Sequence, residues 1–216
     1  MMLMRKMPRH KVAEIRTQRR AGRWTVILDN GRVFGISEDV FISRPLHEGD
    51  FLSDEEIEEY VNADSRSRIK EAAYRLLGFR MRSKNEMKRR LMEKGFPREM
   101  VDPLIDELES KGYLNDREFA LAFARDKIRS RSLGPVALRS ELSVHRLDPE
   151  IIRDTIKTVY EEFPVEKLLN RLLSKRKIMP DTKLSPKEKK RVFNFLRRKG
   201  FTNDLIMKIL NKHPVG

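Results

Sequence analysis

The stretch SKNEMKRRLMEKGFPREMVDPLIDEL (Ser83–Leu108) is the part of the sequence on which the fold prediction depends. A second stretch, GPVALRSELSVHRLDPEIIRDTIKTV (Gly134–Val159), can be laid over it with an offset of 51 residues, which pairs Leu91 with Leu142. A further shift of 54 residues brings Leu142 onto Leu196. Because self-similarity at such a period is typical of proteins built from stacked units, the sequence predicts three copies of one unit.

The apolar residues of this half of the chain recur with the period of an α-helix. Ile69, Ala72, Ala73, Leu76 and Leu77 fall on one helical face, and similar stripes continue toward the end of the chain. A helix-stop pattern also recurs, in which a cation is followed by glycine and then by an aromatic residue that can fold back onto the last turn. It occurs as Lys94-Gly95-Phe96, Lys111-Gly112-Tyr113 and Lys199-Gly200-Phe201.

Helix starts are marked by side chains that can accept hydrogen bonds from free backbone amides, with or without a proline in the first turn. They occur at Ser83-x-x-Glu86, Asn115-x-x-Glu118, Asp148-Pro149 and Ser185-Pro186. Stops and starts together predict three short helices per unit. Pro103 conflicts with a continuous helix from Pro97 to Lys111, so either Asp102 caps a shorter helix or the helix is kinked.

The first 50 residues instead alternate with the period of a β-strand. Three short runs, Val12–Arg16, Trp24–Leu28 and Arg32–Ile36, predict strands, and Asn30-Gly31 favours a hairpin with a type I′ turn. Such a unit is too small to be stable alone and is expected to pack on the next part of the chain. The pattern Ser53-Asp54-Glu55-Glu56 is typical of a capping box and predicts that the helices begin there.

The predicted fold is therefore mainly α. Three tandem three-helix repeats are expected to form an elongated, curved body, preceded by a small N-terminal β-hairpin or β-sheet unit. We expect residues 1–63 to hold the β unit and a linker helix, and residues 64–111, 112–163 and 164–216 to be repeats 1, 2 and 3.

Composition restricts the class of protein. The chain has 216 residues and no cysteine, which excludes disulfides, thiolate zinc sites and cysteine nucleophiles. Its start lacks the apolar stretch of a secretion signal, and no window approaches the length of a membrane-spanning segment. We therefore expect a cytoplasmic protein that is not associated with a membrane.

The formal net charge of +14 is concentrated at one end, because residues 164–216 hold 15 Lys and Arg against four Asp and Glu. If the repeats are rotated regularly, the basic clusters would form a discontinuous strip able to follow a polyanion; the alternative is ordinary surface decoration. The candidate filament- or DNA-binding residues are Arg80, Arg82, Lys84, Lys88, Arg89, Arg90, Arg125, Arg129, Arg131, Lys187, Lys189, Lys190, Arg191, Arg197, Arg198 and Lys199.

Aromatic residues do not interleave with these charges. They lie within or beside the apolar stripes, which favours a role in the core over base stacking. Trp24, the only tryptophan, is expected to fill the core of the β unit. The set assigned to the helical core is Tyr74, Phe119, Phe123, Phe193 and Phe195.

The sequence offers no set of residues typical of an enzyme. The four histidines have no metal-ligand spacing, there is no glycine-rich phosphate loop, and neighbouring carboxylates on a helix would point in different directions. We therefore expect no catalytic residues, no metal and no cofactor, and reject a nuclease.

Two segments resemble the repeats of the RecX family. The first, from Ala72 to Gly95, carries Leu76-Leu77, Arg80, Arg82-Ser83, Glu86, Leu91 and Lys94-Gly95. The second carries Tyr113-Leu114-Asn115-Asp116, Phe119-Ala120, Gly134 and Glu141-Leu142. The order and spacing of these motifs over roughly residues 67–160 are specific, whereas the third repeat matches more loosely and the N-terminal β unit departs from the shortest members.

This resemblance implies a regulator of homologous recombination that binds the RecA–DNA filament and inhibits or modulates its growth, ATP hydrolysis and strand exchange. It implies RecA as the partner, with single- and double-stranded DNA contacted weakly or through RecA. We expect the protein to be a monomer. The alternative from the residues alone is an autonomous DNA-binding helical protein that acts through its basic repeats. No second helix offers an obvious Asn, Gln and Arg set for base edges, which disfavours sequence-specific readout.

Overall fold

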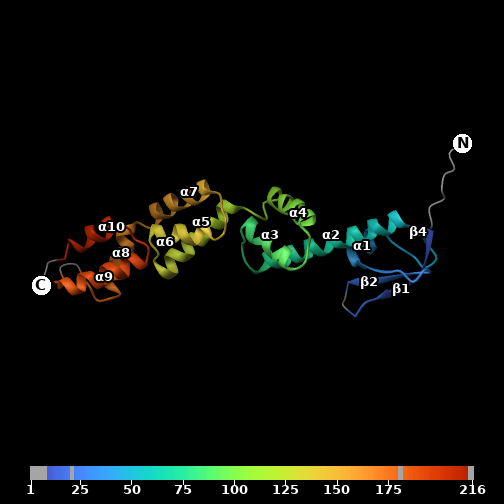
Figure 1. Cartoon of the computed structure of the whole chain (residues 1–216), viewed down its shortest axis with the longest axis horizontal. Coiled ribbons are helices and arrows are strands. Elements are labelled where there is room, and N and C mark those ends of the chain that lie inside the picture. The colour runs from blue at the N-terminus through green and yellow to red at the C-terminus, as the bar shows by residue number, and fades with distance from the viewer. Residues whose placement is uncertain (1–8, 20–21, 180–181, 214–216) are drawn as a thin grey trace. The chain divides into compact units, whose positions relative to one another are not determined.

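The computed structural model describes residues 9–19, 22–179 and 182–213 (Figure 1). The chain divides into two compact units. Unit 1 comprises the residues up to Arg80 together with Arg90–Asp106. Unit 2 comprises Met81–Arg89 together with the residues from Glu107 onward.

Unit 1 begins with a four-stranded antiparallel sheet. Its strands are β1 (Arg9–Thr17), β2 (Arg23–Leu28), β3 (Val33–Ser37) and β4 (Phe51–Ser53), in the order β3-β2-β1-β4. The three predicted strands are confirmed with slightly different ends. The sequence did not predict β4 or the short helix α1 (Glu38–Ser43), because each is too short for a periodic pattern.

The β2–β3 hairpin is confirmed, but the predicted type I′ turn is wrong. Of the two central residues, only Gly31 has a positive φ, +81°, whereas a type I′ turn requires both. The backbone N–H of Leu28 donates to the carbonyl of Arg32 at 2.9 Å, which leaves a three-residue loop closed by left-handed Gly31. The Asn30 side chain supports the loop by accepting from the Arg32 N–H at 2.9 Å.

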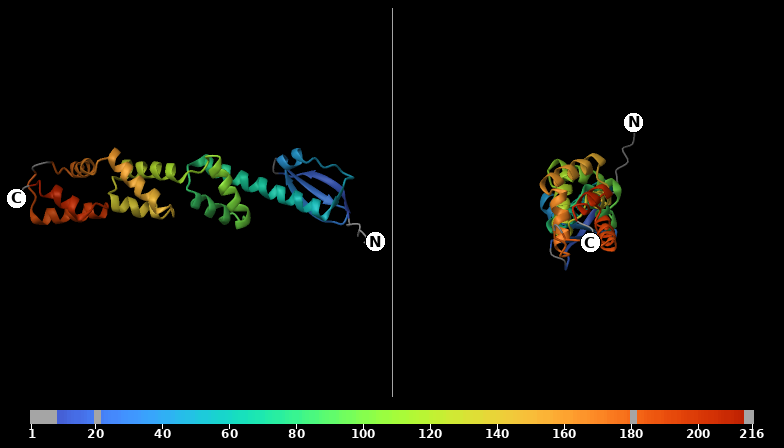
Figure 2. Two further views of the ribbon diagram at one scale, coloured as in Figure 1. Left: turned by 90° about the horizontal axis from the view of Figure 1, so that it is seen from above. Right: turned by 90° about the vertical axis from the view of Figure 1, so that its left-hand side faces the viewer.

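Helix α2 (Asp54–Phe79) lies against the sheet and shares its core (Figure 2). The predicted capping box is confirmed, since Ser53 Oγ accepts from the Glu56 N–H and the Glu56 carboxylate accepts from the Ser53 N–H. The helix is continuous through residues 63 and 64, where we placed a domain boundary. Trp24 is half-buried and stacks on Phe41 with ring centroids 4.5 Å apart, in keeping with its predicted place in the core.

Helices α3 (Lys84–Glu93) and α4 (Arg98–Ser110) follow α2. Helix α4 runs through Pro103 without interruption, so the alternative of a shorter helix capped by Asp102 is wrong. Pro103 is exposed and lies in the second turn, where the missing N–H affects a single hydrogen bond of the helix.

Six helices form most of unit 2: α5 (Asp116–Arg131), α6 (Pro135–Ser143), α7 (Pro149–Glu162), α8 (Val165–Ser174), α9 (Pro186–Arg198) and α10 (Asn203–Leu210). The predicted caps are confirmed at Asn115, Asp148 and Ser185, each of which accepts from backbone amides of the next turn. No described helix is long and apolar enough to cross a lipid bilayer.

The three predicted helix stops have the same geometry. Gly95, Gly112 and Gly200 have φ values of +89°, +75° and +86°. In each stop, the N–H of the following aromatic residue donates to the carbonyl five residues earlier, at 2.9–3.3 Å. This pattern is the Schellman motif, which only glycine forms without strain at the left-handed position.

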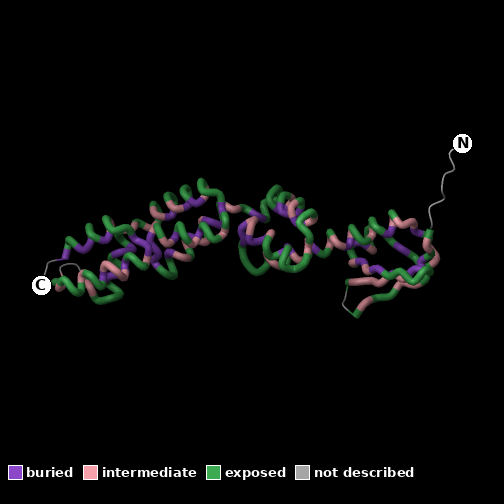
Figure 3. The backbone as a smooth tube through the Cα atoms, viewed as in Figure 1, coloured by how far each residue is buried: buried purple, intermediate pink, exposed green. Residues whose placement is uncertain are grey.

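Three leucines that the repeat alignment matches are equally buried. Leu91, Leu142 and Leu196 are each 0% exposed, as predicted. One hydrophobic cluster extends from Phe119 to Leu210 and includes residues from both predicted repeats 2 and 3 (Figure 3). The two repeats therefore share one core.

The assignment of five aromatic residues to the core is correct for four of them. Phe119 is buried, and Phe123, Phe193 and Phe195 are half-buried against the shared cluster of unit 2. Tyr74 is instead 42% exposed. Tyr74 lies at the edge of the apolar stripe of α2, where no other described helix covers it fully.

Candidate functional site

Arg82 differs from the other predicted binding residues because its side chain is buried. Its guanidinium is 9% exposed and pairs with the Glu86 carboxylate, 6% exposed, at 2.6 Å. Ser83 between them is fully buried, and its hydroxyl caps α3 by accepting from the Glu86 N–H at 3.1 Å. The predicted inclusion of Arg82 in a basic surface is therefore wrong, because its charge is balanced inside the protein.

Other cations of the first cluster are also engaged within the chain. Lys84 Nζ lies 2.7 Å from a Glu109 oxygen, and Arg90 pairs with Glu93 at 3.2 Å. Carboxylates at these distances offset the positive potential that a polyanion would sense. The three remaining members also take part in interactions within the described chain, and they are Arg80, Lys88 and Arg89.

Two of the three predicted cations of the second cluster, Arg125 and Arg131, are also paired with carboxylates. Arg125 forms a two-point ion pair with Glu162, at 2.9 and 2.5 Å, and this hydrogen bonding lowers the pKa of the Glu162 carboxyl. Arg131 pairs with Glu141 at 3.2 Å, and Arg129 lies over the ring of Phe163.

The third cluster differs because five of its cations have no such partner. They occupy positions i, i+3, i+4, i+10 and i+11 of α9, which fall on one helical face, opposite the buried Val192 and Leu196. Within the described part of the chain, no carboxylate forms an ion pair with any of them. We call this set the α9 stripe, and it consists of Lys187, Lys190, Arg191, Arg197 and Arg198.

The one carboxylate of α9, Glu188, is committed to the helix start. It accepts from the N–H and the hydroxyl of Ser185 at 2.8 and 2.6 Å, and these bonds lower the pKa of the Glu188 carboxyl. The other two predicted residues of this cluster point elsewhere: Lys189 Nζ donates to the His213 carbonyl at 2.7 Å and Lys199 Nζ to the Arg131 carbonyl at 3.0 Å.

A further cation near α9 was not among the predicted residues. The guanidinium of Arg176, in the loop after α8, lies 3.8 Å from the ring centroid of Phe195 on α9. The flanking Lys175 and Lys177 are exposed. The three consecutive cations were visible in the sequence, but their proximity to α9 depends on how α8 and α9 pack.

At the start of the second helix of each repeat, backbone N–H groups already donate hydrogen bonds to other groups of the chain. At α3, the Lys84 N–H donates to Asp116 at 2.8 Å. At α6, the N–H groups of Gly134 and Val136 donate to the carbonyls of Lys199 and Gly200, at 2.7 and 3.0 Å. The capping box of Ser185 and Glu188 covers the start of α9. Helix-turn-helix proteins present this end to DNA, so the arrangement disfavours such a docking mode.

Among the described residues, no group of three or more His, Asp and Glu side chains is placed to hold a metal ion. The distinctive chemical feature of unit 2 is therefore a row of cations along one exposed helix.

Comparison with known proteins identifies the family. Residues 70–108 match the RecX first three-helix domain, and residues 115–156 match the RecX second three-helix domain. Regulatory protein RecX of Bacillus subtilis strain 168 is 32% identical over 200 residues, which cover 90% of this chain and 74% of that protein. The chain belongs to the RecX family.

Other RecX proteins support this assignment. Regulatory protein RecX of Bacillus velezensis strain FZB42 is 30% identical over 197 residues, again covering 90% of this chain and 74% of that protein. A crystal structure of regulatory protein RecX has the same fold, with a TM-score of 0.69 and 24% identity over 94% of this chain and 99% of that one. The two family matches lie within residues 64–111 and 112–163, where repeats 1 and 2 were predicted.

Proposed function

We propose that this RecX-family chain regulates homologous recombination by binding the RecA–DNA filament and limiting its growth, ATP hydrolysis and strand exchange. Membership of a family of regulatory proteins supports this proposal. The observation that carries it is the α9 stripe, since a row of cations without intramolecular carboxylate partners attracts a polyanion such as a DNA-containing filament.

In this proposal, RecA supplies specificity and the DNA inside the filament supplies electrostatic attraction. From Lys187 to Arg198, the α9 stripe extends for about 16 Å at the rise of an α-helix, enough to face several phosphates. The protein would act as a monomer in the cytoplasm, without a cofactor or a catalytic centre of its own. The paired clusters of repeats 1 and 2 would contribute less to binding.

The test measures inhibition of RecA ATP hydrolysis on single-stranded DNA. Replacing Lys190 and Arg191 by Glu should raise the concentration needed for half-inhibition by about tenfold, because two attractive contacts become repulsive. The matched control reverses two exposed cations of repeat 2, Arg139→Glu and Lys157→Glu, and should leave inhibition near that of the parent chain. Equal losses for both variants would show that the net charge, and not the α9 stripe, governs binding.

The second candidate is an autonomous DNA-binding protein, which the same α9 stripe favours. The occupied N-termini of the second helices weigh against base readout, so any such binding would be sequence-independent. Titrations of bare and RecA-coated DNA over a salt series separate the two candidates, because phosphate-driven binding weakens steeply with salt. Tighter binding to bare DNA at every salt concentration would favour the second candidate.

A further inference from the structure

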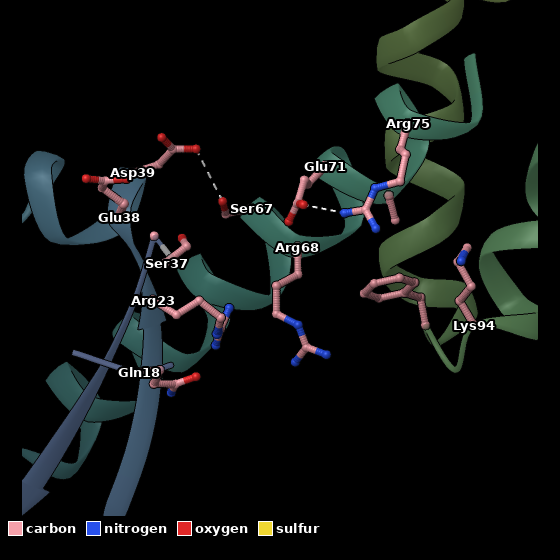
Figure 4. Close-up of a pocket in the computed structure, with 13 residues that line it drawn as sticks. Gln18, Arg23, Ser37, Glu38, Asp39, Ser67, Arg68, Glu71, Arg75 and Lys94 are labelled. Carbon is pink, nitrogen blue, oxygen red and sulfur yellow. Dashed lines mark hydrogen bonds and ion pairs between the residues drawn. The ribbon is translucent and has the colours of Figure 1, made fainter. Parts of the chain in front are cut away.

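Unit 1 contains a groove of about 750 Å³, and none of its lining residues belongs to the predicted basic clusters (Figure 4). One wall is formed by Gln18, Arg23 and the start of α1. Residues 67–75 of α2 form the floor, and Lys94 and Phe96 after α3 form the opposite wall. All of these residues belong to unit 1. The volume is typical of a ligand-binding cleft.

The first wall is held in place by a buried ion pair. Both terminal nitrogens of Arg23 donate to the Asp64 carboxylate, at 3.1 and 3.0 Å, and Asp64 is 4% exposed. Such a two-point pair fixes the orientation of the guanidinium. Gln18 is fixed as well, since its amide donates to Thr25 Oγ1 at 3.0 Å. These side chains therefore shape the groove without supplying a free charge.

Free positive charge comes from the floor and the opposite wall. Arg68 on α2 is exposed, as is Lys94, and neither side chain has an acidic partner among the described residues. Arg75 also lines the groove, but it pairs with Glu71. Arg68 lies on the floor and Lys94 on the opposite wall, so the two unpaired cations are at separate positions along the groove (Figure 4).

The carboxylates of the groove lie away from Lys94. Glu38 and Asp39 gather beside the start of α1, at the other side of Figure 4. Asp39 accepts from the Ser67 hydroxyl at 3.5 Å, and Glu71 is balanced by Arg75. The end of the groove near Lys94 is therefore suited to an anion.

An aromatic ring accompanies these cations. Phe96 is half-buried and follows the α3 stop, where its N–H donates to the Leu91 carbonyl at 3.3 Å. The following residue, Pro97, restricts the backbone conformation of Phe96. A fixed ring beside unpaired cations is the combination that single-stranded nucleic acids use, with bases stacked on the ring and phosphates on the cations.

We propose that this groove binds a short stretch of single-stranded nucleic acid, with phosphates against Arg68 and Lys94 and a base against the ring of Phe96. The site is separate from the α9 stripe and does not depend on the function proposed for it. Duplex DNA would not fit this role, since its bases are paired and offer no free face to the ring. A free nucleotide shares the chemistry but would occupy only one of the spaced cationic positions.

The test uses the full chain with Lys190→Glu and Arg191→Glu as background, so that the α9 stripe contributes little to binding. Fluorescence anisotropy of a labelled oligothymidine reports binding. Adding Arg68→Glu with Lys94→Glu should weaken binding about tenfold or more, since two phosphate contacts are lost. Phe96→Leu, which keeps an apolar side chain for packing, should weaken it about fivefold through loss of base stacking.

Three comparisons make the result decisive. The reversal Arg139→Glu with Lys157→Glu, in the same background, should change the affinity less than about twofold. A labelled duplex of equal length should not respond to Phe96→Leu, and ATP at equal phosphate concentration should not displace the strand. The proposal is overturned if the control reversal matches the groove reversal, if Phe96→Leu has no effect, or if ATP competes fully. Inhibition of RecA ATP hydrolysis, measured on the same variants, reports separately on the proposed function.

Discussion

Arg82 and Glu86 show how a charged residue in a basic stretch can serve the core instead of the surface. Both side chains are buried, and their 2.6 Å ion pair lies at the start of α3. Taking two charges out of water costs free energy that only a well-formed pair offsets. The pair therefore contributes to the stability of this region as long as both partners are present.

We expect Arg82→Ala to destabilise the protein by about 3–5 kcal/mol, because Glu86 would be left buried without its partner. The double variant Arg82→Met with Glu86→Leu should lose much less, since it leaves no buried charge. Chemical denaturation measures both. A double variant as unstable as Arg82→Ala would contradict this explanation.

Glycine is required at position 134 because the backbone of another segment passes close to it, and not because of its φ and ψ angles. A Cβ atom there would lie 2.4 Å from the carbonyl oxygen of Gly200. The substitution Gly134→Ala should therefore cost about 3 kcal/mol, because the opposing atoms belong to the backbone and have little room to move. Thermal denaturation provides the measurement.

Gly78 is the matched control for this prediction. It lies in α2, and a Cβ there would meet nothing within 4 Å. Gly78→Ala should raise stability by up to about 1 kcal/mol, as expected for an exposed helical position. Similar losses for the two variants would mean that the contact with Gly200 is not the cause.

Ion pairs between helices make the stability of the fold depend on pH. Arg125 on α5 bonds to Glu162 at the end of α7 and lowers the pKa of that carboxyl below its ordinary value of 4.5. A carboxyl whose pKa is lower in the folded state stabilises the fold above its unfolded pKa. This contribution is lost as the pH falls through the folded pKa.

We therefore expect Glu162→Gln to lower the Tm slightly at neutral pH and to have no effect well below pH 4.5. Differential scanning calorimetry at both pH values tests this, with Glu161→Gln as the control on an exposed neighbour. A Tm difference that persists in acid would exclude the ion pair as its origin.

The helices that the sequence predicts well are those with a long apolar stripe or a strong cap. The starts at Ser53 and Ser185 and the stops at Gly95 and Gly200 depend on local chemistry alone. Strand β4 has three residues and depends on pairing with distant β1. The sequence around β4 contains no pattern from which its pairing with β1 could be predicted.

The candidate site was predicted only as a set of clusters. Sequence identifies every cation, but it does not show which of them a carboxylate from another helix neutralises. Arg125 meets Glu162 across 37 positions, and Lys84 meets Glu109 across 25. The sequence alone partly distinguishes the α9 stripe from the other clusters, because α9 contains a single carboxylate.

The largest hydrophobic cluster of unit 2 is shared by two repeats. It includes Leu138 and Leu142 of α6 together with Leu169 of α8 and Leu196 of α9. A three-helix unit of about 50 residues buries too little surface to be secure alone. Repeats 2 and 3 are thus expected to fold as one body.

A fragment of residues 112–216 should consequently unfold in one cooperative transition, whereas residues 112–163 and 164–216 prepared separately should not. Circular dichroism during thermal denaturation distinguishes these outcomes. Cooperative folding of residues 164–216 alone would contradict the importance of the shared core.

The stacking of Trp24 on Phe41 has a practical consequence for following the molecule in solution. The sequence contains one indole, and it lies in unit 1. Its emission will change when the sheet opens and will be silent to events confined to the helices of unit 2. A single optical signal can thus time the loss of one unit independently of the other, without any added label.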